Sequence, residues 1–171
     1  LSAYTTCFDQ HHNQMWVDKL GLNEFGDEDE DLVRTLNTLL QEVETDMTIF
    51  FRLLCTLQSP NPDSLTSAFY DESTIPVQAW TEWLEAWWSR VDGKPNREVM
   101  LQTNPKYVLR NWMSQLAIDA AEKGDFSICD SLHELLQDPY SEQPHHEEKW
   151  FQKRPEWARN RVGCSMLSCS S

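Results

Sequence analysis

Glycine is scarce in this sequence: there are five in 171 residues, and none of them are clustered. A phosphate-binding loop needs consecutive glycines so that the backbone can approach the phosphates, so the sequence predicts no nucleotide cradle of that type. GxSxG and HExxH motifs are also missing, and no cysteine has a neighbouring histidine pattern typical of a nucleophile. We therefore expect neither catalytic nor cofactor-binding residues in this chain.

Alternating apolar and polar residues with β-branched enrichment do not occur over any window of five or more residues. This absence argues against strands. No run of about eighteen apolar residues exists, which argues against a transmembrane helix. An initiator Met, a basic start and an apolar signal core are missing too. We expect an all-α chain that is not secreted and is cut or processed from a longer protein.

Basic residues are few, and the net charge is −14. Residues 1–72 hold 14 acidic against 3 basic residues, whereas residues 73–171 hold 14 against 11. Nucleic acid and anionic membrane are therefore poor partners. From Lys149 onward the balance is positive, and this basic segment is expected to lie back on the acidic body.

Cysteine occurs five times, at positions 7, 55, 129, 164 and 169. An odd number without regular spacing argues against a disulfide scaffold. Cys7, Cys55 and Cys129 lie within helical patterns and are expected to be small buried apolar residues. Metal ligation is not favoured either, because adjacent histidines such as His145 and His146 rarely converge on one ion.

Helical periodicity is present along most of the chain, and it predicts about six helices in an irregular bundle that ends in an antiparallel helix pair. In the first helix, residues 2–20, we expect Tyr4, Phe8, Met15 and Leu20 to mark the apolar side. The expected segments are about 2–20, 30–43, 45–57, 73–93 and 95–102, followed by the pair within 104–140.

The helix pair is the segment around which we expect the chain to be organised. Asn104-Pro105 is an opening signal, and Val108, Leu109, Trp112, Leu116 and Ala120 recur on one helical face. Gly124 ends the first helix in a left-handed conformation, and Asp125 caps the second. Phe126, Cys129, Leu132, Leu135 and Leu136 form the second apolar face. So short a connection predicts antiparallel packing.

Four tryptophans fall within nine residues, at positions 80, 83, 87 and 88. They could form a platform for a sugar or a peptide, but their spacing favours one helical face packed in the core. Arg110 has two open interpretations. It either lies on an exposed face with one hydrogen bond to a cap or loop, or pairs with a buried carboxylate that fixes the helix.

The sequence NPKYVLRNWMSQLAIDAAEKGDF, followed by LLQDPYSEQP, RPEWA and the terminal GCSMLSCSS, resembles the C-terminal part of the selenoprotein O family. MWVDKLGL and DMTIFFRLL near the start agree with it. The resemblance implies a kinase-like fold (a pseudokinase) that transfers AMP from ATP, with Mg²⁺, to Ser, Thr or Tyr hydroxyls of proteins. It also places the nucleotide-binding residues upstream, so the chain alone would be inactive.

The tail is the one place where we expect chemistry. The family carries selenocysteine or cysteine at the third position from the end, where this sequence has Cys169, and its thiol is thought to pair with a cysteine of the kinase-like domain. Cys164 lies five residues earlier, and both thiols are expected to be accessible. We expect residues 1–140 to form the helical region and residues 141–171 to form a flexible polar linker with a redox tail.

Two hypotheses for function follow. By resemblance, the segment supports the catalytic domain of a protein adenylyltransferase and presents a redox-responsive tail; its partners are the upstream kinase-like domain and the protein substrates. That enzyme is mitochondrial in eukaryotes and cytoplasmic in bacteria. The alternative is a stand-alone helical adaptor that binds a protein through its Trp-rich face.

Overall fold

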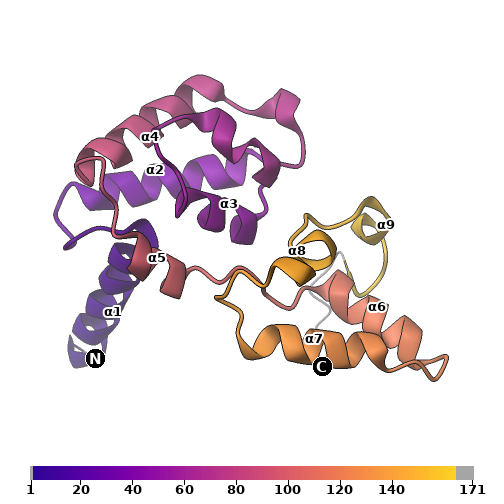
Figure 1. Cartoon of the computed structure of the whole chain (residues 1–171). Coiled ribbons are helices and arrows are strands. Elements are labelled where there is room, and N and C mark those ends of the chain that lie inside the picture. The colour runs from indigo at the N-terminus through magenta and orange to yellow at the C-terminus, as the bar shows by residue number, and fades with distance from the viewer. Residues whose placement is uncertain (1, 165–171) are drawn as a thin grey trace. The chain divides into compact units, whose positions relative to one another are not determined.

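The computed structural model describes residues 2–164, and all regular structure in that range is helical (Figure 1). One isolated backbone bridge, Thr45 to Phe69, is the β-type pairing within it. The helices are α1 (Ser2–Leu20), α2 (Asp29–Glu42), α3 (Met47–Leu54), η1 (Pro62–Ala68), η2 (Glu72–Thr74), α4 (Val77–Arg90), α5 (Arg97–Thr103), α6 (Asn111–Ala121), α7 (Ser127–Gln137), α8 (Pro144–Trp150) and α9 (Glu156–Arg159). The all-α prediction is confirmed for these residues, with more and shorter helices than expected.

The chain divides into two compact units, Leu1–Asn104 and Pro105–Ser171. This division differs from the expected one after residue 140. Residues 141–164 contain α8 and α9, and they place Trp150, Ala158 and Cys164 in the core of the second unit. Their polar sequence lacks a helical period because only these few side chains face inward.

The core of the first unit includes Phe50 and Phe51, two adjacent residues of α3. Both rings are buried, and Leu54 one turn later is fully buried. Asp46 caps the helix by accepting a hydrogen bond from the Ile49 amide at 3.1 Å. The aromatic side chains of α3 and α4 then pack against one another within this core.

Three of the four tryptophans of α4 are core residues and Trp88 is partly buried, so the packing interpretation is confirmed for Trp80, Trp83 and Trp87. Trp80, Trp83 and Trp87 are buried, with the Trp83 and Trp87 rings stacked at 6.2 Å between centroids. The Trp87 indole donates to the Leu20 carbonyl at 2.9 Å, which joins α4 to the end of α1. The Trp-rich face is therefore not available as an adaptor surface. Val77, the first residue of α4, is exposed.

The expected apolar side of α1 is wrong for three of its four residues. Tyr4, Phe8 and Met15 are exposed, and only Leu20 is buried. The core side of this helix is formed instead by Trp16, Val17 and Leu20, at its C-terminal end, where α1 packs on α5. Residues 4–12 are all exposed, including Cys7, so the prediction of a shielded Cys7 is wrong as well.

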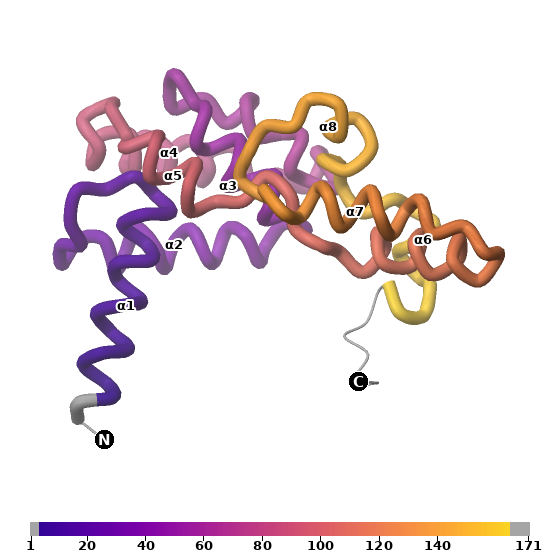
Figure 2. Tube along the Cα trace, turned by 60° about the horizontal axis from the view of Figure 1, so that its bottom comes forward, coloured from indigo at the N-terminus to yellow at the C-terminus, as the bar shows by residue number. Residues whose placement is uncertain are grey.

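The second unit contains the predicted pair of packed helices, α6 and α7, connected by residues 122–126 (Figures 1 and 2). Gly124 has φ +82°, the left-handed conformation expected at the end of α6. Asp125 accepts a hydrogen bond from the Ser127 amide at 2.9 Å, but the N-cap position of α7 is Phe126, one residue later than expected. Phe126, expected on the apolar face, is exposed because it precedes the first turn.

The start of the first helix of the pair is corrected by the structure. Residues 105–110 are not helical, and Val108 and Leu109 are exposed rather than part of an apolar face. The amides of Lys106 and Tyr107 both donate to the Pro139 carbonyl, at 2.9 and 3.1 Å. These hydrogen bonds to a distant segment replace the local hydrogen bonds that a helix would require.

Candidate functional site

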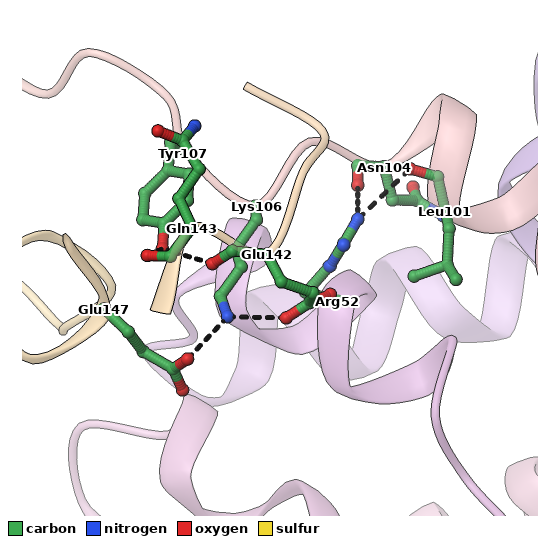
Figure 3. A network of polar contacts seen from close by, with 8 residues as sticks. All are labelled: Arg52, Leu101, Asn104, Lys106, Tyr107, Glu142, Gln143 and Glu147. Atoms are coloured by element: carbon green, nitrogen blue, oxygen red, sulfur yellow. Dashed lines mark hydrogen bonds and ion pairs between the residues drawn. The ribbon is translucent and has the colours of Figure 1, made fainter. Parts of the chain in front are cut away.

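Asn104 lies at the end of the first unit in a buried polar network (Figure 3). Its side-chain nitrogen Nδ2 donates to the Lys19 carbonyl at 3.0 Å, and its side-chain oxygen Oδ1 accepts from Lys19 Nζ at 2.9 Å. Arg52, also buried, donates to the backbone carbonyls of Leu101 and Asn104 at 3.1 and 3.0 Å. Burial lowers the pKa of Lys19. The network satisfies carbonyls at the end of α5.

Lys106 is the buried cation of the second unit, with 3% of its surface exposed. Its Nζ donates to Glu142 at 2.7 Å and to Glu147 at 2.8 Å, and both carboxylates remain about half exposed (Figure 3). Burial alone would lower the pKa of Lys106, but the hydrogen bonds to the two carboxylates outweigh it, and the pKa is raised. The ammonium group therefore stays charged and holds residues 142–147 in place.

Tyr107 reinforces the same attachment. Its hydroxyl donates to the backbone carbonyls of Glu142 and Gln143, at 2.8 and 3.2 Å (Figure 3). Gln143 has φ +40°, a conformation that costs a non-glycine residue roughly 1–2 kcal/mol. Its side chain also donates to the Leu135 carbonyl at 3.0 Å. The neighbouring hydrogen bonds therefore maintain a strained residue at the start of α8.

Arg110 donates to the Gln152 carbonyl at 2.9 Å, which is the loop hydrogen bond of the simpler interpretation. Taken together, residues 104–110 connect separate segments through hydrogen bonds and ion pairs. The two cations of this segment already donate hydrogen bonds, Lys106 to carboxylates and Arg110 to a backbone carbonyl. Such contacts are typical of a structural support rather than of a nucleophile or a proton donor.

Of the two predicted redox residues, Cys164 lies within the described part of the chain and Cys169 does not. Cys164 is 6% exposed and belongs to the core of the second unit, so the accessibility expected for it is wrong. Cys169 lies outside the described residues, and its redox role stays a prediction. Of the other thiols, Cys55 is buried, Cys129 is partly buried and Cys7 is exposed. Burial raises the pKa of Cys55, which makes it less reactive.

Arg161 fixes the chain just before Cys164. Its guanidinium makes two hydrogen bonds to the Asp119 carboxylate of α6, at 2.7 and 2.8 Å. The ion pair lowers the pKa of Asp119 and raises the pKa of Arg161. The Trp157 ring lies against the same guanidinium, with its centroid 5.6 Å from Cζ. The described chain up to Cys164 is therefore anchored on α6 at Arg161.

A groove of about 380 Å³ lies between α2 and α4 in the first unit. Leu32, Ala79 and Trp83 line its apolar part, and Glu28, Asp31 and Glu82 lie at its edge. Asp29, the first residue of α2, is buried and accepts two hydrogen bonds from Arg90, at 2.9 and 3.0 Å. This pair connects the start of α2 to the end of α4.

Across residues 2–164, no three His, Cys, Asp or Glu side chains gather as a metal site would require. The rings of His145 and His146 lie 4.1 Å apart without further ligands of that kind. In the same range no helix is long and apolar enough to cross a membrane.

The sequence interpretation missed Lys106 and the Asp29–Arg90 pair. A signal for Lys106 was present: a lysine flanked by Pro105 and Tyr107, with an acidic segment at 142–148. Sequence alone does not pair residues so far apart, because several lysines and carboxylates fit the same pattern.

Over residues 2–164 the chain is thus an all-α segment whose helices are connected by buried hydrogen bonds and ion pairs. A family model described as "Protein adenylyltransferase SelO" matches residues 1–137. The chain belongs to this family.

The relatives agree with that assignment. The chain is 44% identical over 180 residues to the protein nucleotidyltransferase YdiU of Aromatoleum aromaticum, covering all of this chain and 34% of the relative. It is 44% identical to the YdiU of Flavobacterium johnsoniae, with 35% of that protein covered. For Xanthomonas campestris pv. campestris the identity is 47%, with 90% of this chain and 31% of the relative covered. The chain spans about a third of the relatives it matches.

Proposed function

We propose that this chain is the C-terminal helical region of a protein adenylyltransferase, which transfers AMP from ATP to Ser, Thr or Tyr hydroxyls of proteins. The observation that carries the proposal is the alignment: relatives called protein nucleotidyltransferases match the whole chain, while the chain spans about a third of their length. The kinase-like domain and the protein substrates are then its partners. Its compartment is cytoplasmic in bacteria and mitochondrial in eukaryotes.

The residues described here do not fit an ATP–Mg²⁺ site. Lys106 is the lysine with two carboxylates beside it, but it is buried and both carboxylates are already its partners. No positive charge is left there for a phosphate group, and no glycine-rich loop lies near it. We therefore assign nucleotide chemistry to the rest of the protein and a supporting role to this region.

In that role, the second unit supports the catalytic domain and holds the start of the tail that carries Cys169. The Asp119–Arg161 pair anchors the chain at residue 161, only eight residues before that thiol.

The test compares the full-length protein with this chain. We expect the full-length protein to incorporate AMP from labelled ATP into a protein substrate or itself, and this chain to incorporate none. Calorimetric titration of the chain with Mg-ATP should give no binding at micromolar concentrations. Micromolar binding by the chain, or a full-length protein that transfers no nucleotide, contradicts the proposal.

A further inference from the structure

Helix α1 has two apolar faces, and the first unit covers one of them. Successive helical residues are about 100° apart, so Tyr4, Phe8 and Met15 lie within about 40° of one another. Trp16, Val17 and Leu20 lie on a different side, and they are buried. The first group is exposed: 73% for Tyr4, 57% for Phe8 and 40% for Met15. We call this group the α1 aromatic face.

The aromatic rings along the α1 aromatic face pack against one another. The rings of Tyr4 and Phe8 are stacked with centroids 6.4 Å apart, and Phe8 stacks on His12 at 6.0 Å. His12 in turn accepts a hydrogen bond from the buried Trp16 indole at 3.2 Å. Single exposed apolar residues are common on protein surfaces, whereas a contiguous row of this kind is typical of an interaction surface.

The N-terminal half of α1 also lacks support from its own unit. Residues 4–12 are all exposed, and both views show this part of the helix extending away from the other helices of the unit (Figures 1 and 2). Isolated helical segments shorter than about 12–15 residues are marginal in water. The first turn carries no acidic residue to favour the helix dipole. A surface outside the first unit must therefore stabilise this half.

Two occupants are compatible with such a face: a second copy of the chain, or the rest of the full-length protein. Residues 1–104 hold 18 acidic and 6 basic residues, a net charge of −12, so two copies that met through α1 would repel each other. The relatives that match the entire chain are about three times as long, so they supply a further surface in cis.

We propose that the α1 aromatic face is the surface on which the remaining two thirds of the full-length protein docks, through an apolar groove that receives Tyr4, Phe8 and Met15. This inference rests on the proposed function in taking the chain as one region of a larger enzyme. The docking follows the helix-in-groove mode, in which residues at i, i+4 and i+11 of one helix provide the anchors. It couples the first unit to the catalytic part independently of the tail.

Cys7 is a built-in reporter for this contact. It is exposed, and it lies one residue before Phe8, about 60° around the helix from Tyr4. The experiment measures the alkylation rate of Cys7 by iodoacetamide at one pH, in this chain and in the full-length protein, with peptide mass mapping. Cys55 is buried, and its protection in both samples reports that the first unit is folded.

We expect Cys7 to react at least about tenfold more slowly in the full-length protein, because a docked surface shields it. Phe8→Glu in the full-length protein should restore fast labelling. Gln10→Glu is the matched control: it makes the same charge change on the opposite side of α1, at another exposed position, and should leave Cys7 shielded.

Equal Cys7 rates in the two proteins overturn the inference. Protection of Cys7 in this chain that grows with protein concentration also overturns it, because a second copy is then the occupant. The readout requires no catalysis. A full-length protein with a shielded Cys7 but no AMP transfer supports the docking and contradicts only the proposed enzymatic function.

Discussion

Lys106 shows how one side chain can organise a whole segment. Its side chain is buried, and its ammonium group reaches Glu142 and Glu147. A buried ammonium group without partners would cost several kcal/mol, so the two carboxylates are needed where they lie. Because they are half exposed, their own desolvation cost is small, and the interaction favours folding.

Lys106→Met keeps the aliphatic stem and removes the charge. We expect it to lower the free energy of unfolding by about 1–2 kcal/mol, less than for a fully buried pair because both carboxylates remain hydrated. Urea denaturation measures the change. Lys123→Met, at an exposed position of the same unit, should change it by less than about 0.5 kcal/mol. A similarly small effect for Lys106→Met contradicts the supporting role.

The Asp119 carboxylate makes a pH-dependent contribution to the free energy of unfolding. Hydrogen bonds from Arg161 lower its pKa in the folded protein. A carboxylate with a lowered folded-state pKa stabilises the fold above its unfolded pKa, about 3.9, and this stabilisation is lost as the pH falls through the folded pKa. Asp119→Asn should therefore be less stable than the parent at pH 7 and pH 5, with the difference declining below pH 3.9.

Urea denaturation at pH 7, 5 and 3 checks this expectation. Asp130→Asn is the control, because Asp130 is an exposed carboxylate of α7. An Asp119→Asn variant whose deficit persists undiminished at pH 3 means that the ion pair is not the cause. The same variant should also label faster at Cys164 at pH 7, since Arg161 holds that segment.

Among the elements, α6 carries the core of the second unit. Trp112 is buried and lies 6.0 Å from Trp150 of α8, between ring centroids. We expect Trp112→Ala to lower the free energy of unfolding of this unit by about 3–5 kcal/mol through the cavity it leaves. Trp157→Ala, at a side chain that is 43% exposed, should cost under about 1 kcal/mol. Denaturant melts followed by near-UV circular dichroism would distinguish them, and equal losses would contradict the assignment.

The turn between α6 and α7 depends on Gly124. A methyl group at this position would meet no atom within 4 Å, so the cost of a substitution comes from its φ of +82° alone. Gly124→Ala should therefore destabilise by about 1 kcal/mol. Gly26→Ala, at a glycine without positive φ, serves as the control for a general loss of glycine. If thermal unfolding gives the same shift for both, backbone strain is not the cause.

At the scale of the whole molecule, the thiols report the organisation of the chain. Native-state alkylation of this chain should label Cys7 and Cys169 first, Cys129 next, and Cys55 and Cys164 last, following the burial of the described thiols. In the full-length protein, labelling of Cys169 should depend on reductant. A Cys169→Ser enzyme should lose the redox response of its activity, whereas Cys7→Ser should keep it. A retained response in Cys169→Ser contradicts the redox role.

Local sequence was enough for most elements of the first unit. Apolar spacing and caps predicted α2, α3 and α5 to within a few residues, and the tryptophan spacing identified the core face of α4. Gly124 was expected at a helix end, and its φ is positive, as are those of Gly21 after α1 and Gly93 after α4. These features depend on neighbours within about one helical turn, which is why the sequence carries them.

Tertiary structure alone decided the core side of α1, the backbone conformation of residues 105–110 and the burial of Cys164. Periodicity groups Tyr4, Phe8 and Met15 on one face but does not state which surface covers that face, so the core was assigned to the wrong side of α1. Residues 105–110 have a helical pattern, yet the hydrogen bonds of Lys106 and Tyr107 to residues some 35 positions later replace a helical turn. Cys164 is buried because Arg161 attaches its segment to Asp119. Contacts between residues distant in sequence leave no local pattern, and they determined which side chains became accessible.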